Sequence, residues 1–549
     1  MDQRFNRIIP LISRNDPIIN SLNLSNIPLG DEMMQELTRS LNQNSFISKI
    51  VLKYNKLSPE SCNLVFDLLF TNPKLTFLDI SNNEVNDESL IHLSEVLKKL
   101  PPSREPIMLV LRQNKFTQIG AKALADALEH NVPVHWLDLR YDHHIGDEGV
   151  ESIAYSLSNN TNLTGLDLIQ CGCRERACSA LSDVLIDNQT LTTILLQDKL
   201  DFQSINSLGQ FLSDPSCALQ SLYLWHCELN AELTEVLCRA LQSNRSLSIL
   251  ALSYNHIDDH GGVFLADMIV RNTAIVKLQL GCNLLTAQSA GFFGVALAKN
   301  STLKFLDLSR NQIFSYGVWP LAISLKDNHS LTSIDLRYNK IDQHGGEMLC
   351  ELIEKNDSLQ SIRLSGNSFG DSPISMLAEK LEHNTKLKEI EINEVQMTDV
   401  GFISLCKALQ HNVALEKLTA NGNFLNVSAM KAFADLLKEN TSLLSISINK
   451  CNINDDCCPY IEKGIASNST LKSLDLSKNH LTVEGVKCIA DALFGNYTIL
   501  QVEWQDEDFN DHDDEFTSLI ADFLERNNYY QHNLLTKDMI TLLVDPALI

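Results

Sequence analysis

Long apolar runs are missing from this sequence of 549 residues. No stretch of 18 or more apolar residues occurs, so the sequence predicts no membrane-spanning helix and no membrane partner. The first ten residues, Met1 to Pro10, also lack the uninterrupted apolar segment of a secretory signal. We therefore expect a cytoplasmic protein.

Positive charge is scarce in this sequence. The 44 Lys and Arg residues are outnumbered by 69 Asp and Glu residues, which gives a formal net charge of −25 at pH 7. Such a chain repels phosphate backbones and offers no basic stripe that could release counterions from a nucleic acid. The balance argues against nucleic acid as the main ligand and favours a protein partner with a neutral or basic surface.

Signature motifs of enzymes are absent as well. The sequence contains no Walker A phosphate loop, no HExxH zinc motif, no GxSxG nucleophile elbow and no catalytic-cysteine signature. We therefore expect no enzymatic activity and no cofactor.

Two segments begin like metal sites without completing the pattern. Asp506 to Asp511 starts like a calcium loop, but Asp511 stands where the sharp turn needs Gly, and Thr517 stands where a bidentate Glu belongs. The second segment has cysteines close enough for zinc, but the repeat described below explains them as core residues. These cysteines are Cys171, Cys173 and Cys178.

The fourteen cysteines are scattered over strand ends and helix faces rather than concentrated in a disulfide framework. Free thiols in a reducing cytosol are therefore the better interpretation.

Most of the sequence consists of one leucine-rich pattern, called the phrase below, which repeats about every 28 residues. Apolar residues at positions 1, 4 and 6, such as Leu331, Ile334 and Leu336, show the alternation of a short strand with one buried face. About fifteen residues later the apolar spacing becomes helical, as in Gly120 to Leu128 and Val263 to Ile269. Each unit is therefore predicted to be strand, turn and helix. The first positions are Ile19, Ile47, Leu75, Pro106, Val134, Leu163, Leu191, Leu219, Leu247, Ile275, Leu303, Leu331, Leu359, Leu387, Leu415, Leu443, Leu471 and Ile499.

Position 9 of the phrase is usually Asn, where the chain leaves the strand and its backbone groups need partners. A buried Asn amide can both donate and accept hydrogen bonds there. Cys171, Cys227 and Cys451 occupy the same slot, which should tolerate only a small side chain with some hydrogen-bonding capacity. The Asn residues are Asn55, Asn83, Asn255, Asn283, Asn311, Asn339, Asn367, Asn423 and Asn479.

This pattern resembles the leucine-rich repeat, and the 28-residue period resembles its ribonuclease-inhibitor-like subfamily, which includes Ran GTPase-activating proteins and the repeat domains of NOD-like immune receptors. The resemblance implies an α/β solenoid of about 18 repeats, a horseshoe with parallel strands on the concave face and helices on the convex face. We expect an N-terminal cap at residues 1–18, the solenoid at 19–509 and a C-terminal helical cap or docking tail at 510–549, with a helix over Glu515 to Arg526.

Two repeats depart from the period. Lys98 to Pro106 inserts three residues and three prolines, which predicts a rigid bulge on the rim. Asp142 to Gly149 has one extra residue; it is either a His-bearing binding loop or an ordinary insertion, and the second interpretation is favoured.

Several triplets match the N-glycosylation pattern. They all precede position 1 of the next repeat by the same three residues, so the repeat itself generates them, and we discount glycosylation. The acceptor residues are Asn188, Asn300, Asn440 and Asn468.

Positions 3, 5, 7 and 8 of each phrase are expected on the concave strand face or its edge. Tyr223 and Trp225 lie two residues apart on one strand and so point the same way, and Tyr254 comes from the adjacent strand. We predict a contiguous exposed aromatic patch that grips a partner, because aromatics and Arg dominate interface energetics. Solvated strand surface is the alternative, and it fits the scattered charges best. The predicted protein-binding residues are Tyr223, Trp225, His226, Tyr254, Trp136, Asp138, Arg140, Tyr141, Arg112, Arg337 and Tyr338.

These features favour a non-enzymatic protein-interaction scaffold. Three settings suit it: the recognition part of a cytosolic receptor, a ribonuclease-inhibitor-like blocker, or an effector that an intracellular bacterium delivers into host cytosol, which the Asn- and Ile-rich style resembles slightly more. The alternative is a GTPase-activating protein of the Ran type. No segment aligns residue by residue with the functional positions of that family, so no catalytic residue is assigned.

Overall fold

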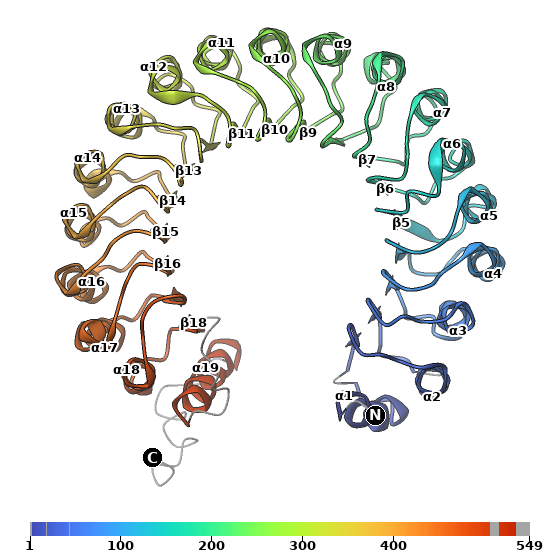
Figure 1. Cartoon of the computed structure of the whole chain (residues 1–549), viewed down its shortest axis with the longest axis horizontal. Helices are drawn as coiled ribbons and strands as arrows, with labels where there is room; N and C mark the ends of the chain where they lie inside the picture. The colour runs from blue at the N-terminus through green and yellow to red at the C-terminus, as the bar shows by residue number, and fades with distance from the viewer. Residues whose placement is uncertain (1–2, 18, 43, 506–514, 534–549) are drawn as a thin grey trace. The chain divides into compact units, whose positions relative to one another are not determined.

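The computed structural model describes residues 3–17, 19–42, 44–505 and 515–533. It contains two compact units, residues 1–279 and 280–549. Both units alternate a short strand with a helix, as the sequence predicts (Figure 1).

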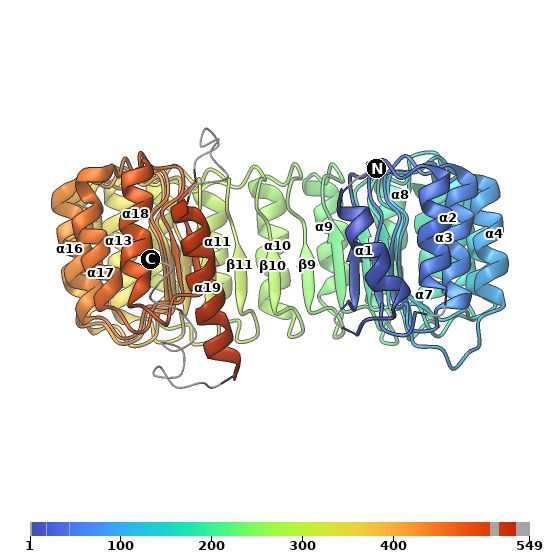
Figure 2. The ribbon, with the colours of Figure 1, turned by 90° about the horizontal axis from the view of Figure 1, so that it is seen from below.

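The first unit opens with α1 (Gln3–Ser13) and continues as strand–helix pairs, with the strands on the inner side and the helices on the outer side (Figure 1). The strands are β1 (Ser21–Asn23), β2 (Lys49–Val51), β3 (Phe77–Asp79), β4 (Ile107–Val110), β5 (Val134–Asp138), β6 (Gly165–Leu168), β7 (Thr193–Leu196), β8 (Ser221–Leu224), β9 (Ile249–Ala251) and β10 (Lys277–Gln279). The helices are α2 (Asp31–Leu41), α3 (Pro59–Thr71), α4 (Asp87–Lys98), α5 (Gln118–Glu129), α6 (Gly146–Ser156), α7 (Glu175–Leu185), α8 (Phe202–Ser213), α9 (Ala231–Leu241) and α10 (Asp259–Arg271). Figure 2 shows α2, α3 and α4 standing side by side.

The second unit has the same organisation. Its strands are β11 (Phe305–Asp307), β12 (Ser333–Asp335), β13 (Ser361–Arg363), β14 (Glu389–Glu391), β15 (Lys417–Thr419), β16 (Ser445–Ser447), β17 (Ser473–Asp475) and β18 (Gln501–Glu503). Its helices are α11 (Ala287–Leu297), α12 (Phe314–Leu325), α13 (Gln343–Lys355), α14 (Asp371–His383), α15 (Asp399–Leu409), α16 (Val427–Glu439), the 3-10 turn η1 (Asp455–Cys457), α17 (Cys458–Ser467), α18 (Val483–Phe494) and α19 (Glu515–Asn533).

Neighbouring strands within each unit pair in parallel, and each residue faces its counterpart one repeat away. Leu22 of β1 lies opposite Ile50 of β2, and Ile334 of β12 lies opposite Ile362 of β13. The side chains of positions 1, 4 and 6 point into the core, so Ile334 is fully buried. The leucine-rich repeat fold class with parallel inner strands and outer helices is thereby confirmed.

The helices bury one apolar stripe against the strands. In α5, Leu124 and Leu128 are at most 2% exposed, and in α10, Leu265 and Ile269 are at most 3% exposed. Val263 of the same predicted stripe is 43% exposed, because it lies at the outer side of α10. Each helix therefore covers the gap between the strands with residues at i and i+4 and leaves the opposite face to solvent.

The position-9 Asn residues form a column of buried hydrogen bonds in each unit. The side chain of Asn367 accepts from the backbone N–H groups of Asn339 and Ile341 and donates to the carbonyls of Leu336 and Leu364. One amide thus ties two consecutive repeats together and satisfies the backbone where it leaves the strand. The predicted role of this Asn is confirmed.

Cysteine in the position-9 slot keeps the donor half of this role. The thiols of Cys171, Cys227 and Cys451 donate to the carbonyls of Leu139, Leu196 and Ala420 of the preceding repeats. All fourteen cysteines are free thiols.

A second Asn column runs where each helix ends, and it includes the residues of the N-glycosylation triplets. The side chain of Asn440 accepts from the backbone N–H groups of Ser442 and Leu443 and donates to the carbonyls of Leu409 and Asn412 one repeat earlier. The side-chain amides of these residues are therefore engaged in hydrogen bonds within the fold, so the triplets have a structural role. Asn188, Asn300, Asn440 and Asn468 are at most 9% exposed.

The two irregular repeats are absorbed locally. The insertion before β4 sends Arg104 inward, where its guanidinium donates to the carbonyls of Asn72 and Leu75, and the β4–β5 register shifts between Ile107 and Met108. In the second irregular repeat, His143 and His144 are exposed on a turn that ends in the left-handed Gly146.

Helices also lie at both ends of the described chain. At the start, the side chain of Asn15, just after α1, donates to the Ser45 hydroxyl and accepts from the Ser45 backbone N–H in the first repeat. At the other end, the predicted helix from Glu515 is confirmed as α19, and its Asn527 donates to the carbonyls of Asn496 and Ile499, which extends the second Asn column. The calcium-like segment from Asp506 to Asp511 lies outside the described residues. No helix among those described is long and apolar enough to cross a membrane.

Candidate functional site

The inner strand face of each unit carries the side chains of positions 3, 5 and 7, and position 8 forms its edge. Position 8 adopts a left-handed backbone in nearly every repeat, with φ of 57° at Tyr54, 51° at His226 and 61° at Tyr254. Its N–H donates to the position-7 carbonyl of the next repeat, as from Tyr54 to Ser81, which holds the turn. Bulky residues rarely adopt this conformation, so the aromatic side chains there are displayed at some conformational cost.

Two aromatic pairs lie on β8 and on the turns that follow β8 and β9. The rings of Tyr223 and Trp225 meet edge to face, with centroids 5.2 Å apart. The imidazole of His226 stacks on the ring of Tyr254, with centroids 4.6 Å apart. Tyr223 and Trp225 are partly buried, His226 is exposed and Tyr254 is 49% exposed. Of the three predicted anchors, the structure pairs Tyr223 with Trp225, and it pairs Tyr254 with His226, another residue of the predicted surface.

The strand face around these rings carries little charge. Tyr223 lies between Leu195 of β7 and Ala251 of β9 in the parallel register, and both neighbours are almost fully buried. The position-3 residues Thr193, Ser221 and Ile249 on the same three strands are uncharged as well. Burial also raises the pKa of Tyr223. Sequence reasoning singled out the rings but missed this uncharged surround, which reading positions 3 and 5 down the repeats reveals.

Trp136 lies a few strands away on the same unit, and a glycine makes room for it. A Cβ atom added to Gly165 of β6 would lie 2.1 Å from Cε3 of the Trp136 ring. The indole therefore lies directly over the β6 backbone, where any side chain at Gly165 would displace it. Trp136 is partly exposed in this position.

A network of two arginines and two aspartates adjoins Trp136. Arg140 binds Asp138 through Nε and Nη2, at 3.1 and 2.8 Å, and its Nε lies 2.9 Å from Asp167. Arg112 Nε lies 3.1 Å from the Asp138 carboxylate. Asp138 is 1% exposed, so it acts on this surface by holding Arg112 and Arg140 rather than by reaching a partner itself. Burial, reinforced by the Asp138 charge, raises the pKa of Asp167 to about 7.

Tyr141 follows Arg140 at position 8 and is 38% exposed at the edge of the face. The next residue, Asp142, occupies the position-9 slot that Asn fills in most repeats. Asp142 accepts a hydrogen bond from the backbone N–H of Asn114 at 2.6 Å, but its other carboxylate oxygen is buried without a hydrogen-bond partner. Burial raises the pKa of Asp142 to about 8.

Arg337 and Tyr338 belong to the second unit. Arg337 binds Asp335 through Nε and Nη2 and lies 3.5 Å from Glu391. The Tyr338 ring stands between Arg310, whose guanidinium carbon is 4.2 Å from the ring centroid, and Gly366, where an added Cβ would lie 2.2 Å from the ring. These residues form a polar, internally paired surface, separate in character from the aromatic pairs of the first unit.

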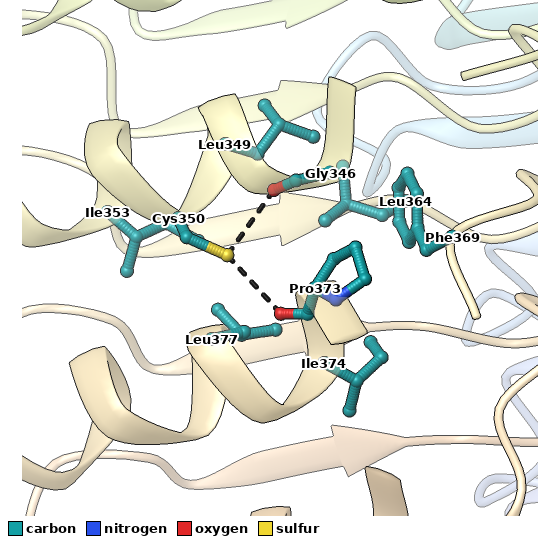
Figure 3. Close-up of a pocket in the computed structure, with 9 residues that line it drawn as sticks. All are labelled: Gly346, Leu349, Cys350, Ile353, Leu364, Phe369, Pro373, Ile374 and Leu377. Carbon is teal, nitrogen blue, oxygen red and sulfur yellow. Dashed lines mark hydrogen bonds between the residues drawn. The ribbon is translucent and has the colours of Figure 1, made fainter. Parts of the chain in front are cut away.

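Neither the cysteines nor the enclosed pocket between α13 and α14 offers a ligand site among the described residues. Cys173 and Cys178 are buried with sulfurs 3.8 Å apart, and no group of three metal-binding side chains occurs among the described residues. Figure 3 shows an apolar pocket between α13 and α14, with a volume of ≈ 10 Å³, where the Cys350 thiol donates to the carbonyls of Gly346 and Pro373. That volume is at the lower limit for one water molecule.

Comparison with known proteins agrees with this geometry. The family model described as Leucine Rich repeat matches residues 71–94, 135–154, 243–266, 299–316, 327–350 and 467–490. The chain is 33% identical over 240 residues to NACHT, LRR and PYD domains-containing protein 14 of Mus musculus, which covers 43% of the chain and 24% of that protein. It is 31% identical over 264 residues to NACHT, LRR and PYD domains-containing protein 3 of Homo sapiens, covering 47% of the chain and 25% of that protein.

The ribonuclease inhibitor of Mus musculus is 28% identical over 272 residues, which covers 49% of the chain and 57% of the inhibitor. The chain thus spans about a quarter of the two NACHT relatives and just over half of the inhibitor. The matches agree with the repeat pattern of the sequence. The chain is therefore built of leucine-rich repeats, and its repeats are similar to those of the ribonuclease-inhibitor-like proteins.

Proposed function

We propose that this chain is a protein-interaction scaffold whose inner strand face in the first unit binds a protein partner. Tyr223, Trp225 and Tyr254 are the anchors. The proposal is carried by one observation: two ring pairs stand partly exposed on adjacent repeats of a rigid face. Aromatic anchors in uncharged surroundings are typical of the centre of an interface, where desolvation costs little.

The charged groups beside this centre suit its rim. Arg112 and Arg140 are 31% and 26% exposed and are already paired with Asp138 and Asp167. Such a preorganised network orients a partner rather than supplying most of the affinity. With a net charge of −25, the chain attracts a neutral or basic protein surface more readily than an acidic one.

The experiment is the combined replacement Tyr223→Ala, Trp225→Ala and Tyr254→Ala in the full chain. We expect unchanged helical circular dichroism and loss of a partner captured from cytosol, since each buried aromatic anchor contributes about 2 kcal/mol or more, roughly 30-fold in Kd. Phe70→Ala with Tyr155→Ala is the matched control, because these rings are 59% and 50% exposed on helices of the same unit. Equal capture by the triple variant would refute the proposal.

The effector setting and the Ran-type alternative have no support in the comparisons. Neither an effector role nor a Ran-type GTPase-activating role is indicated by the relatives named above. A phosphate-release assay with a panel of small GTPases separates the scaffold from a GTPase-activating protein: we expect no acceleration of GTP hydrolysis, and acceleration would favour the enzymatic alternative.

A further inference from the structure

An exposed apolar patch stands on the outer face of α12 in the second unit. Tyr316, Trp319 and Ile323 are 86%, 57% and 45% exposed, and their spacing of three and four residues places them on one face of the helix. Val295 of the neighbouring α11 is 59% exposed. The opposite face of α12 is buried through Val318, Leu321, Ala322 and Leu325. These four exposed residues, Val295, Tyr316, Trp319 and Ile323, are called the α12 patch.

The outer face of the next helix shows that the patch is a departure from the repeat. One repeat after Tyr316, Trp319 and Ile323, helix α13 carries His344, Glu347 and Glu351. Polar residues are the usual choice on the solvent side of an amphipathic helix. Helices α11 and α12 contain no Asp, Glu, Lys or Arg at all. A contiguous uncharged apolar surface of this kind marks an interaction site.

Charge points to a second copy of this chain as the occupant. The patch has no carboxylate to attract a basic partner and no cation to attract an acidic one. Lys326, at the C-terminal end of α12, is already paired with Glu351 at 3.3 Å, so the rim is neutral there. On a chain of net charge −25, such a patch is a place where two copies meet without opposing like charges.

The spacing of the patch is also self-complementary. Trp319 lies at the midpoint of α12, which spans residues 314–325. If two copies of the helix pack antiparallel about a two-fold axis through this midpoint, Trp319 meets its own counterpart, and Tyr316 meets Ile323 of the partner subunit. In such an isologous interface each contact occurs twice. We propose that the full chain forms a symmetric dimer through the α12 patch.

The size of the patch sets the expected affinity. These side chains expose on the order of 400 Å² per copy, about half of the roughly 800 Å² per partner in a standard interface. We therefore expect a dimer that dissociates at concentrations on the order of 1–10 µM.

Sedimentation equilibrium of the full chain from below 1 µM to about 100 µM tests the dimer. We expect Tyr316→Glu and Trp319→Glu each to weaken dimerisation at least about 30-fold, while Phe70→Glu, with the same charge on an equally exposed ring, leaves it unchanged. Because the replaced side chains face solvent, thermal unfolding should stay the same. A monomer throughout this range, or a dimer that survives both substitutions, would overturn the proposal.

Disulfide trapping tests the antiparallel geometry. Residues 316 and 323 of one helix are about 10 Å apart, too far for a bond within one chain. Under mild oxidation we expect the double variant Tyr316→Cys with Ile323→Cys to cross-link two chains, and neither single variant to do so. Equal cross-linking by a single variant would overturn the arrangement. Trp319-dependent flotation of a monomeric chain with neutral vesicles would assign the patch to a lipid surface and reject the dimer.

Discussion

Among the position-9 residues, Asp142 is the one whose replacement by Asn should change the free energy of unfolding most clearly. Its carboxylate stands where Asn367 and its equivalents use an amide, and one oxygen of the carboxylate is buried without a partner. In Asp142→Asn the new amide should donate to the carbonyls of Leu111 and Leu139, which correspond to the Leu336 and Leu364 acceptors of Asn367. We expect this variant to be more stable than the natural chain at neutral pH.

The magnitude follows from the pKa of Asp142, which burial raises from 3.8 to about 8. Because the pKa of Asp142 is raised in the folded state, the contribution of this residue to the free energy of unfolding is fully present below pH 3.8. It is lost as the pH rises towards 8. Each pH unit in that window costs about 1.4 kcal/mol. The variant lacks this loss, so its advantage should grow by about 2.7 kcal/mol between pH 5.5 and pH 7.5.

Urea unfolding of both proteins at pH 5.5, 6.5 and 7.5 measures this difference. Other titrating groups, including Asp167, are common to both proteins and cancel in the comparison. Asn83→Asp is the matched control, because it places a carboxylate in an ordinary slot of the same column and should import the same pH dependence. Parallel pH profiles for Asp142→Asn and the natural chain would refute the reasoning.

Three further substitutions test other parts of the structure. Asn367→Ala removes four buried hydrogen bonds and should cost about 3–5 kcal/mol in urea unfolding; a loss below about 1 kcal/mol would show that the column contributes little. Gly165→Ala should displace the Trp136 indole without unfolding the chain, seen as a shift in tryptophan fluorescence that is absent in Trp136→Phe with Gly165→Ala; an unchanged spectrum would contradict the close approach. Gly366→Ala forces a side chain onto a residue with φ of 70° and against Tyr338, so the melting temperature should fall, and an unchanged value would count against strain there.

The repeat fold is predictable from the sequence because the same residue pattern recurs in every repeat. Positions 1, 4 and 6 and the position-9 Asn recur at a fixed spacing, and a buried residue such as Ile334 has the same surroundings in every repeat. The second Asn column is visible too, but at Asn440 and its equivalents the sequence predicts only that the repeat generates the glycosylation triplets. Their hydrogen bonds reach back 28 and 31 residues, which no local pattern displays.

The candidate surface was predictable in part. Strand alternation alone places Tyr223 and Trp225 on one side. It does not reveal that Tyr254 stacks on His226, because this contact depends on the left-handed turn that both residues share. The pairing of Asp138 with Arg112 is equally invisible locally, because Arg112 comes from the preceding repeat. The outward face of α12 could not be assigned, because the helix is apolar on all sides and its periodicity defines no buried stripe.

The two Asn columns bear on how chains of this kind change in length. Each position-9 amide bonds only to its own repeat and to the one before it, as Asn367 does with the repeat that contains Asn339. Each amide of the second column bonds to the preceding repeat and to the first residue of the next one, as Asn440 does with Leu409 and Leu443. Removing or duplicating a whole 28-residue block leaves every remaining amide facing an equivalent set of backbone groups. A deletion of any other length displaces the donors from their acceptors at the junction, so gain and loss of complete blocks is the route by which such a chain is lengthened or shortened.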